Sequence, residues 1–264
     1  MAEKFHIKPT KIPKTPLPST DLVKYEGKAT KSQIQGYQQK VGTLNFPANI
    51  TRPDIAKASA KLCQFLQNPS PDHIVAVDQA LEYTVGTKYR AIQFDGKADH
   101  KRLFVTSGDS AFADDPATRY SSHGYAFSLY GGLIDWKAVK GKTVTLSSTE
   151  AELLAITLTA KEFIRWTRLF KAMDFDLDED PVIYCDNRQT IRLLKQETPK
   201  LKTALRHVDI HQSWLRQEVQ AGRIDVEWIP TAEMMADGFT KMLPAQKHAE
   251  FVRQLGLVDI KGRI

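Results

Sequence analysis

The sequence has few of the features that mark secreted, membrane-spanning or zinc-binding proteins. Only two of its 264 residues are cysteines, Cys63 and Cys185, and it contains no CxxC pair or Cys/His cluster. Both cysteines are therefore expected to be small buried side chains in a reducing compartment. No run approaches the roughly 20 apolar residues that cross a bilayer, and the first twenty residues lack the apolar core of a secretory signal. We expect an intracellular protein, cytoplasmic or nuclear, without a membrane partner.

Positive charge is what the chain has in excess, and it lies in two blocks. The net charge is +6 and the isoelectric point about 9.1. Residues 1–40 hold eight lysines against three acidic side chains, a net charge of +5, and residues 186–216 have a net charge of +4. Such blocks favour a polyanionic partner, although a solvated tail or face is the simpler interpretation of the first one.

The composition and periodicity of the chain divide it into three parts. Residues 1–30 carry four prolines and no apolar period, so they predict an extended, mobile lead-in. Residues 31–88 predict a small helical subdomain, with one helix from Pro53 and another from Pro71, capped by Ser70 and ended by Gly86. Residues 89–264 predict a separate α/β domain.

In that last part, short β-rich runs come first and helices then alternate with strands. The runs "YRAIQFDG", "RLFVTSGD", "GYAFSLYGG" and "LIDWKAVK" predict an antiparallel meander. A long helix should follow, from a capping box of Ser147 and Glu150 to about Met173. "PVIYC" and "RIDVEWIP" then predict two strands among shorter helices. The resulting order is βββ-α-β-α-α-β-α.

Four acidic residues stand where these strands end or helices begin. Asp109 ends "LFVTSGD", Asp186 follows "PVIYC", Glu152 lies one turn into the long helix, and Asp237 opens the helix after the last strand. Any one of them alone more often serves a helix dipole. Together they predict an oxygen-only site for two Mg²⁺ ions, with Mn²⁺ as a substitute. Two ions about 3.5–4 Å apart can activate water and stabilise the leaving oxygen of a phosphodiester.

Several ordered motifs resemble one known family. "SGDSAFADDPATRYSSHGYAFSLYGGLIDW", "TVTLSSTEAELLAI", "IYCDNRQTIRLL", "LRHVDIHQSWLRQEVQAGRIDVEWIPT" and "MMADGFTKMLP" resemble the ribonuclease H region of copia-type retrotransposon Pol polyproteins, in their fungal form. The stretch from "YQQKVGTLNF" to "ALEYTVGT" resembles the thumb and connection tail of the reverse transcriptase of these elements. The resemblance runs from about residue 16 to the end and suggests the C-terminal part of such a polyprotein.

The resemblance implies a fold, an activity and a set of catalytic residues. The fold is a ribonuclease H-like mixed sheet of three antiparallel and two parallel strands with flanking helices. The activity is endonucleolytic cleavage of the RNA strand of an RNA–DNA hybrid. The motifs assign catalysis and metal binding to Asp109, Glu152, Asp186 and Asp237. The polymerase palm and fingers should lie upstream as a partner in the intact polyprotein, because "FADD" at 112–115 falls in the loop after a strand rather than in a palm.

The first motif departs from the usual pattern of the family. The usual order is Ser-Asp-Ala-Asp-Trp, whereas residues 108–112 read Gly-Asp-Ser-Ala-Phe. This departure supports an alternative, a catalytically decayed or domesticated module that binds nucleic acid or a partner. An integrase-type nuclease is a weaker alternative, because that family closes its site with a glutamate rather than with Asp237.

Basic and polar residues near the expected metal site are candidates for contact with the hybrid. They are Asn187, Arg188, Arg192, Arg206 and His207. Contacts from arginine to the phosphate backbone should be independent of base sequence and sensitive to salt. Asn187 is a candidate for a hydrogen bond to a 2′-hydroxyl. His207 and His211 have a spacing that could bind a metal, but a basic helix face near phosphate, or a solvated face, is the preferred interpretation.

Overall fold

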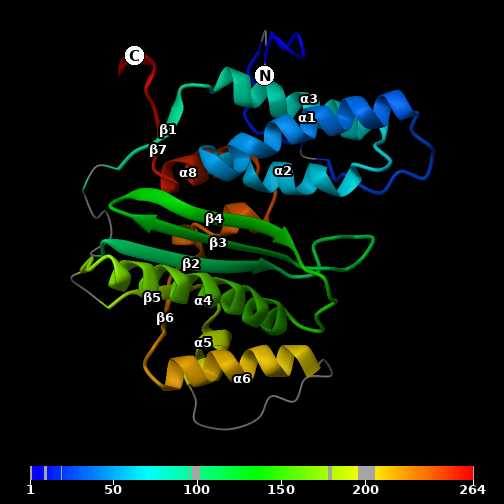
Figure 1. Ribbon diagram of the computed structural model, residues 1–264. Coiled ribbons are helices and arrows are strands. Elements are labelled where there is room, and N and C mark those ends of the chain that lie inside the picture. Colours follow the sequence, from blue (N-terminus) through cyan, green and yellow to red (C-terminus); the bar gives the residue numbers. More distant parts are fainter. Residues whose placement is uncertain are drawn as a thin grey trace. The chain divides into compact units, whose positions relative to one another are not determined.

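A computed structural model describes residues 2–8, 11–18, 20–94, 96, 102–177, 180–195 and 206–263, without the side chains of residues 206–209, 211 and 212. The chain divides into two compact units (Figure 1). Unit 1 consists of Met1–Gln93 and Lys241–Ile264, and unit 2 is Phe94–Thr240. Within the described part of the chain, no helix is long and apolar enough to cross a membrane.

Unit 1 is mainly helical and closes with a short two-stranded sheet. Its helical elements are α1 (Lys31–Ile50), η1 (Pro53–Ile55), α2 (Ala56–Leu62), η2 (Cys63–Phe65), α3 (Pro71–Gly86), α8 (Ala245–Gln254) and η4 (Lys261–Arg263). Strand β1 (Arg90–Ile92) pairs antiparallel with β7 (Leu257–Asp259). The expected helix from Pro71 to Gly86 is confirmed, and the Ser70 hydroxyl caps it by accepting a hydrogen bond from the His73 amide.

The described residues of the expected lead-in, 2–8, 11–18 and 20–30, form turns, bends and irregular backbone, and some of them pack into unit 1. Leu17 and Leu22 are buried in the same apolar cluster as residues of α1, α2 and α3. The Asn68 side chain donates to the carbonyl oxygens of Tyr25 and Gly27 and accepts from the Ala29 amide. The expectation of a mobile tail was therefore wrong, because isolated leucines between prolines reach a core without forming any periodic pattern.

A buried polar network joins both sequence segments of unit 1. Arg52 binds the Asp54 carboxylate with two nitrogens, at 2.8 and 2.7 Å, and the Tyr83 hydroxyl donates to Asp54 at 2.8 Å. Because that hydroxyl has one proton to give, His248 Nε2, 2.8 Å away, must donate to it, as Arg90 also does. Burial would raise the pKa of Asp54, but hydrogen bonds and charge from Arg52 hold it below its usual value. Burial also lowers the pKa of His248 to about 4.

Unit 2 is built on a five-stranded mixed sheet. Its strands are β2 (Phe104–Ala111), β3 (Ser122–Leu129), β4 (Gly132–Lys140), β5 (Val182–Cys185) and β6 (Asp225–Trp228), and its helices are α4 (Ser148–Ala172), α5 (Arg188–Lys195), α6 (Arg206–Gln220), η3 (Thr231–Glu233) and α7 (Asp237–Thr240). The strand order is β4-β3-β2-β5-β6. The first three strands pair antiparallel, and β2–β5 and β5–β6 pair parallel. This confirms the expected α/β class and the ribonuclease H-like sheet.

Two expectations about element boundaries were wrong. The run "YRAIQFDG" lies outside the five-stranded sheet, because its strand β1 pairs with β7 instead. Residues 241–264 were expected to belong to the α/β domain, but they fall in unit 1, where β7 and His248 find their partners. The first boundary consequently lies after Gln93 rather than after residue 88.

The long helix starts where expected, with one change in its cap. The Ser147 hydroxyl accepts from the Glu150 amide, but the Glu150 carboxylate accepts from the amide of Leu146 rather than from that of Ser147. The helix therefore has a serine cap without the reciprocal bond of a full capping box.

Two glycines show that helices lie against both faces of the sheet. A Cβ on Gly108 of β2 would lie 2.3 Å from Thr159 Oγ1 of α4. A Cβ on Gly124 of β3 would lie 2.7 Å from the Cβ of Phe239 in α7. Helix α4 thus runs along one face, as Figure 1 shows, and α7 packs on the other. Because Asp109 pairs with Gly124 across the strands, its side chain points to the α7 face.

Candidate metal centre

Asp109 and Asp186 meet at the carboxyl ends of two neighbouring parallel strands. The pairing of β2 with β5 joins Ser107 to Tyr184, and continuing that register brings Asp109 level with Asp186. Asp237, the first residue of α7, approaches from the face that Asp109 points to. One carboxylate oxygen from each of the three acids lies within 4.8 Å of the other two. The predicted convergence of these residues is therefore observed in the geometry.

Glu152 forms a second group around the same Asp186. It is buried one turn into α4, and its carboxylate lies within 4.8 Å of Asp186 and of the Cys185 thiol. Burial, and then the Glu152 charge, raise the pKa of Cys185, so the thiol stays protonated and is a poor metal ligand. The second group therefore offers two carboxylates, and Asp186 is common to both groups.

Two threonine hydroxyls and a tryptophan orient the aspartates. Thr231 donates to Asp186 Oδ2 at 2.8 Å, and Thr240 donates to Asp109 Oδ2. The Trp228 indole N–H donates to the backbone carbonyl of Asp186 at 3.1 Å. Sequence reasoning missed these three residues, although "EWIPT" and "GFTK" stood inside the quoted motifs. Supports of this kind usually keep metal-binding carboxylates in one orientation.

The set of side chains fits a hard divalent cation. All four acids offer oxygen atoms, which Mg²⁺ and Mn²⁺ prefer. Carboxylates within 4.8 Å of one another repel unless a cation lies between them. Asp186 is common to both groups, so its carboxylate lies within 4.8 Å of those of the other three acids.

The candidate nucleic-acid contacts lie mainly on α5. The Asn187 side-chain oxygen accepts from the amides of Gln189 and Thr190, so it caps α5 and leaves only the amide nitrogen for other contacts. Arg188 and Arg192 are exposed on the same helix. Arg206 and His207 belong to the backbone of α6, but their side chains lie outside the described part of the chain. A role of all five in binding stays a prediction.

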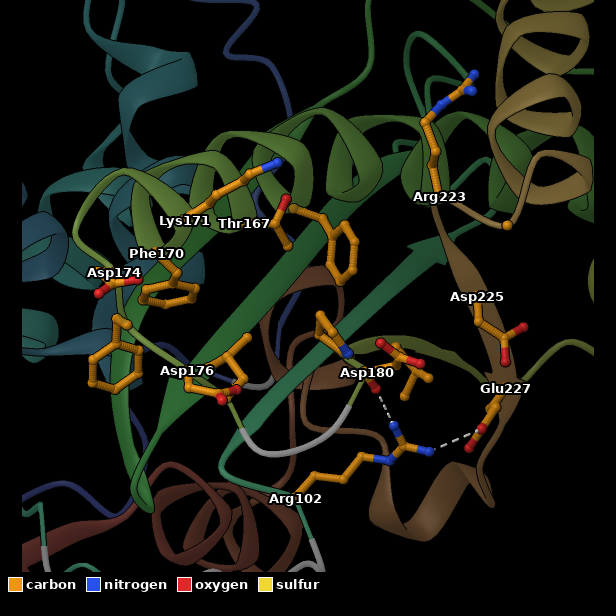
Figure 2. A pocket seen from close by; sticks show the side chains of 16 residues that line it. Arg102, Thr167, Phe170, Lys171, Asp174, Asp176, Asp180, Arg223, Asp225 and Glu227 are labelled. Atoms are coloured by element: carbon orange, nitrogen blue, oxygen red, sulfur yellow. Dashed lines mark hydrogen bonds and ion pairs between the residues drawn. The ribbon is translucent and has the colours of Figure 1, made fainter.

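A pocket lies at the end of the sheet opposite to the acidic centre. It has a volume of about 1030 Å³ and is lined at the amino ends of β5 and β6 and at the last turns of α4. Figure 2 shows Arg102 inside it, bound to the carbonyl of Asp180 and to the Glu227 carboxylate. Because the acidic centre lies at the carboxyl ends of β2 and β5, this pocket is separate from it.

Comparisons with known proteins give consistent results for nearly the whole chain. The retrovirus-related Pol polyprotein of transposon TNT 1-94 from Nicotiana tabacum is 34% identical over 251 residues, which are 93% of this chain and 18% of that protein. The corresponding polyprotein of transposon RE1 from Arabidopsis thaliana is 32% identical over 253 residues, which are 96% of this chain and 17% of that protein. The chain thus spans less than a fifth of the length of these relatives.

Among solved structures, a ribonuclease H1 isolated from compost is similar with 12% identity and a TM-score of 0.40, over 52% of this chain and 91% of that one. No family model matches the sequence. The identities to the two plant polyproteins extend over both units, from the helical part to the acidic centre. The chain belongs to the copia-type Pol polyproteins of retrotransposons.

Proposed function

We propose that this chain carries the ribonuclease H activity of its element, a metal-dependent endonuclease that cuts the RNA strand of an RNA–DNA hybrid. The observation that carries the proposal is the assembly of four acids, three of which have a carboxylate within 4.8 Å of that of the fourth, Asp186. They come from four separate elements, β2, α4, the end of β5 and α7, and reach one end of the sheet. A structural role would not require four like charges to converge.

Each acid has a defined part in the proposed reaction. Asp109, Asp186 and Asp237 would hold one Mg²⁺, and Glu152 with Asp186 a second one. Two such ions supply activation of the attacking water and stabilisation of the leaving oxygen. Thr240 and Thr231, which donate to the carboxylates of Asp109 and Asp186, would keep these carboxylates in one orientation for binding such ions. The products would be a 3′-hydroxyl and a 5′-phosphate.

The substrate would be recognised by its backbone and shape. Arg188 follows Asp186 by two residues, Arg192 lies one turn further along α5, and both would contact phosphates without reading the bases. Groove width and 2′-hydroxyl groups would distinguish a hybrid from duplex DNA. Since the chain spans less than a fifth of its relatives, we also propose that the reverse transcriptase palm and fingers are its partner in the full polyprotein.

The test is cleavage of a hybrid whose RNA strand is labelled, in Mg²⁺ and in Mn²⁺. We expect metal-dependent cutting of the RNA strand alone, with no cutting of duplex DNA, and loss of cutting in Asp186→Asn. Asp174→Asn is the matched control, because Asp174 is exposed, remote from the acids, and has a positive φ of 54° that asparagine tolerates well. The control should cut like the wild type.

Two results would contradict the proposal. Equal cutting by Asp186→Asn would show that the activity does not come from this centre. A folded chain that binds hybrid but does not cut it in either metal would favour the alternative, a catalytically decayed or domesticated binding module, which the altered first motif at residues 108–112 supports.

A further inference from the structure

An exposed tryptophan stands directly beside the acidic centre. Trp228 is the last residue of β6, and 42% of its surface is exposed. Its indole N–H donates to the carbonyl of Asp186 at 3.1 Å. The Arg188 guanidinium carbon lies 3.9 Å from the centre of its ring. The ring is therefore fixed by one contact to the metal-site backbone and by another to a cation.

The position of Arg188 is not explained by the stability of its own helix. It is the first residue of α5, where the helix dipole favours an acidic side chain. Within the described ranges of the chain, Arg188 forms no ion pair with an acidic residue. The indole face is thus the contact that holds this exposed cation in place.

This arrangement suits a backbone phosphate. A guanidinium that stacks on an aromatic ring uses one of its faces and keeps its in-plane N–H groups available, in the planar fork that matches phosphate oxygens. Arg188 lies two residues after Asp186, the acid common to both carboxylate groups. A phosphate bound there would be next to the one at the acidic centre.

We propose that Trp228 is a positioning residue that contacts both Arg188 and the backbone of Asp186 and so fixes Arg188 relative to the metal site. Arg188 would then bind the phosphate of the hybrid that is adjacent to the scissile one. The inference rests on the proposed function, because it takes an RNA–DNA hybrid as the ligand. Trp228 itself does not touch the reacting atoms. Its contribution is to convert a flexible arginine into a fixed phosphate contact beside the metal ligands.

The test separates positioning from simple loss of charge. The affinity for a hybrid is measured against KCl concentration with Ca²⁺ in place of Mg²⁺, since its looser coordination geometry differs from that needed for cutting. The slope of log K against log salt is negative, and we expect Arg188→Ala to lower its magnitude by about 0.9, the value for one phosphate contact. Trp228→Ala should lower the slope similarly, and the double variant should lower it no further. Trp228→Phe, which keeps a ring face, should restore most of the slope.

The chain offers a matched control in a second arginine–tryptophan pair. Arg165 lies over the Trp166 ring at 5.9 Å, with both residues on α4. Arg165→Ala removes the same charge and a longer ring contact away from the four acids, together with the ion pairs of Arg165 to Asp135 and Glu162, and should leave the slope unchanged. In Mg²⁺, Arg188→Ala should raise KM for the hybrid about tenfold with little change in kcat, whereas Trp228→Ala, which also releases the backbone carbonyl of Asp186, should raise KM similarly and lower kcat as well. Circular dichroism spectra would show whether each variant is folded.

The outcomes distinguish this inference from the function on which it rests. Wild-type chain that binds no hybrid at any salt concentration would overturn the proposed function. Wild-type binding, with the slope unchanged in Arg188→Ala and Trp228→Ala, would leave that function standing and overturn the phosphate contact. A slope lowered by Arg188→Ala but not by Trp228→Ala would overturn the role of the tryptophan.

Discussion

Replacement of Asp109 by asparagine should stabilise unit 2 when divalent cations are absent. The same replacement should abolish cleavage when they are present. Asp109 is buried, and its carboxylate lies within 4.8 Å of those of Asp186 and Asp237. Asparagine has nearly the same shape, and its side-chain oxygen can still accept the hydrogen bond from Thr240. The substitution therefore removes one charge from the cluster and leaves the packing almost unchanged.

The expected gain follows from the distances. Two unit charges 4.8 Å apart repel by about 3.5 kcal/mol at an effective dielectric constant of about 20. Two such pairs disappear with Asp109, but water reaches the half-buried Asp186 and Asp237 and weakens both repulsions. The hydrogen bond from Thr240 also becomes weaker by about 1 kcal/mol when its acceptor is neutral. We expect a net increase of about 1–3 kcal/mol in the free energy of unfolding.

Tryptophan fluorescence is the appropriate assay. All four tryptophans lie between residues 94 and 240, so their emission reports on unit 2 alone. Urea unfolding in EDTA should show Asp109→Asn more stable than wild type, and Mg²⁺ should stabilise the wild type much more than the variant. Asp174→Asn should behave as wild type in both conditions. A variant less stable than wild type in EDTA would refute the reasoning that the acids repel one another in the metal-free chain.

Three further predictions concern the supports of the two units. Burial lowers the pKa of His248 to about 4 in the folded chain, against 6.5 ordinarily, so the unfolded chain takes up a proton first as the pH falls. The free energy of unfolding of unit 1 should therefore decrease by up to about 3 kcal/mol between pH 6.5 and pH 4. Urea unfolding followed by circular dichroism should show a weaker dependence of this free energy on pH for His248→Gln. Thr240→Val removes the hydroxyl on Asp109 and should slow hybrid cleavage about tenfold or more, with near-normal rates in Thr240→Ser. Gly108→Ala sets a Cβ against Thr159 and should cost about 1–3 kcal/mol by fluorescence-monitored unfolding, partly recovered by adding Thr159→Ala.

The acidic centre could be predicted because each of its acids has a local signal. Asp109 lies near the end of one apolar strand and Asp186 follows another, Glu152 lies one turn into a helix, and Asp237 begins a helix. Parallel neighbours bring their carboxyl ends to one edge, so the pairing of β2 with β5 was sufficient to place the first two together. Three antiparallel strands followed by two parallel ones were likewise expected, and the sheet confirms them.

The contacts that support the centre could not be predicted in this way. Thr240 and Asp109 are 131 residues apart, and their hydrogen bond depends on which face of the sheet α7 covers. No period in a four-residue helix indicates that face. The pairing of β1 with β7 could not be predicted for the same reason. Each strand has three residues, which is too short for a pattern that would indicate its partner on the far side of unit 2 in the sequence.

The network around Tyr83 has a consequence for the order of folding during synthesis. Tyr83 and its partner His248 are 165 residues apart in the sequence, and the separation between β1 and its partner strand β7 is similar. A ribosome therefore releases the whole of unit 2 before it releases the residues that complete unit 1. In the interval Arg52, Asp54 and Tyr83 lack the imidazole, and β1 is an unpaired edge. We expect the nascent chain to fold its inserted α/β unit first and to be most vulnerable to proteolysis within residues 1–93 until α8 emerges.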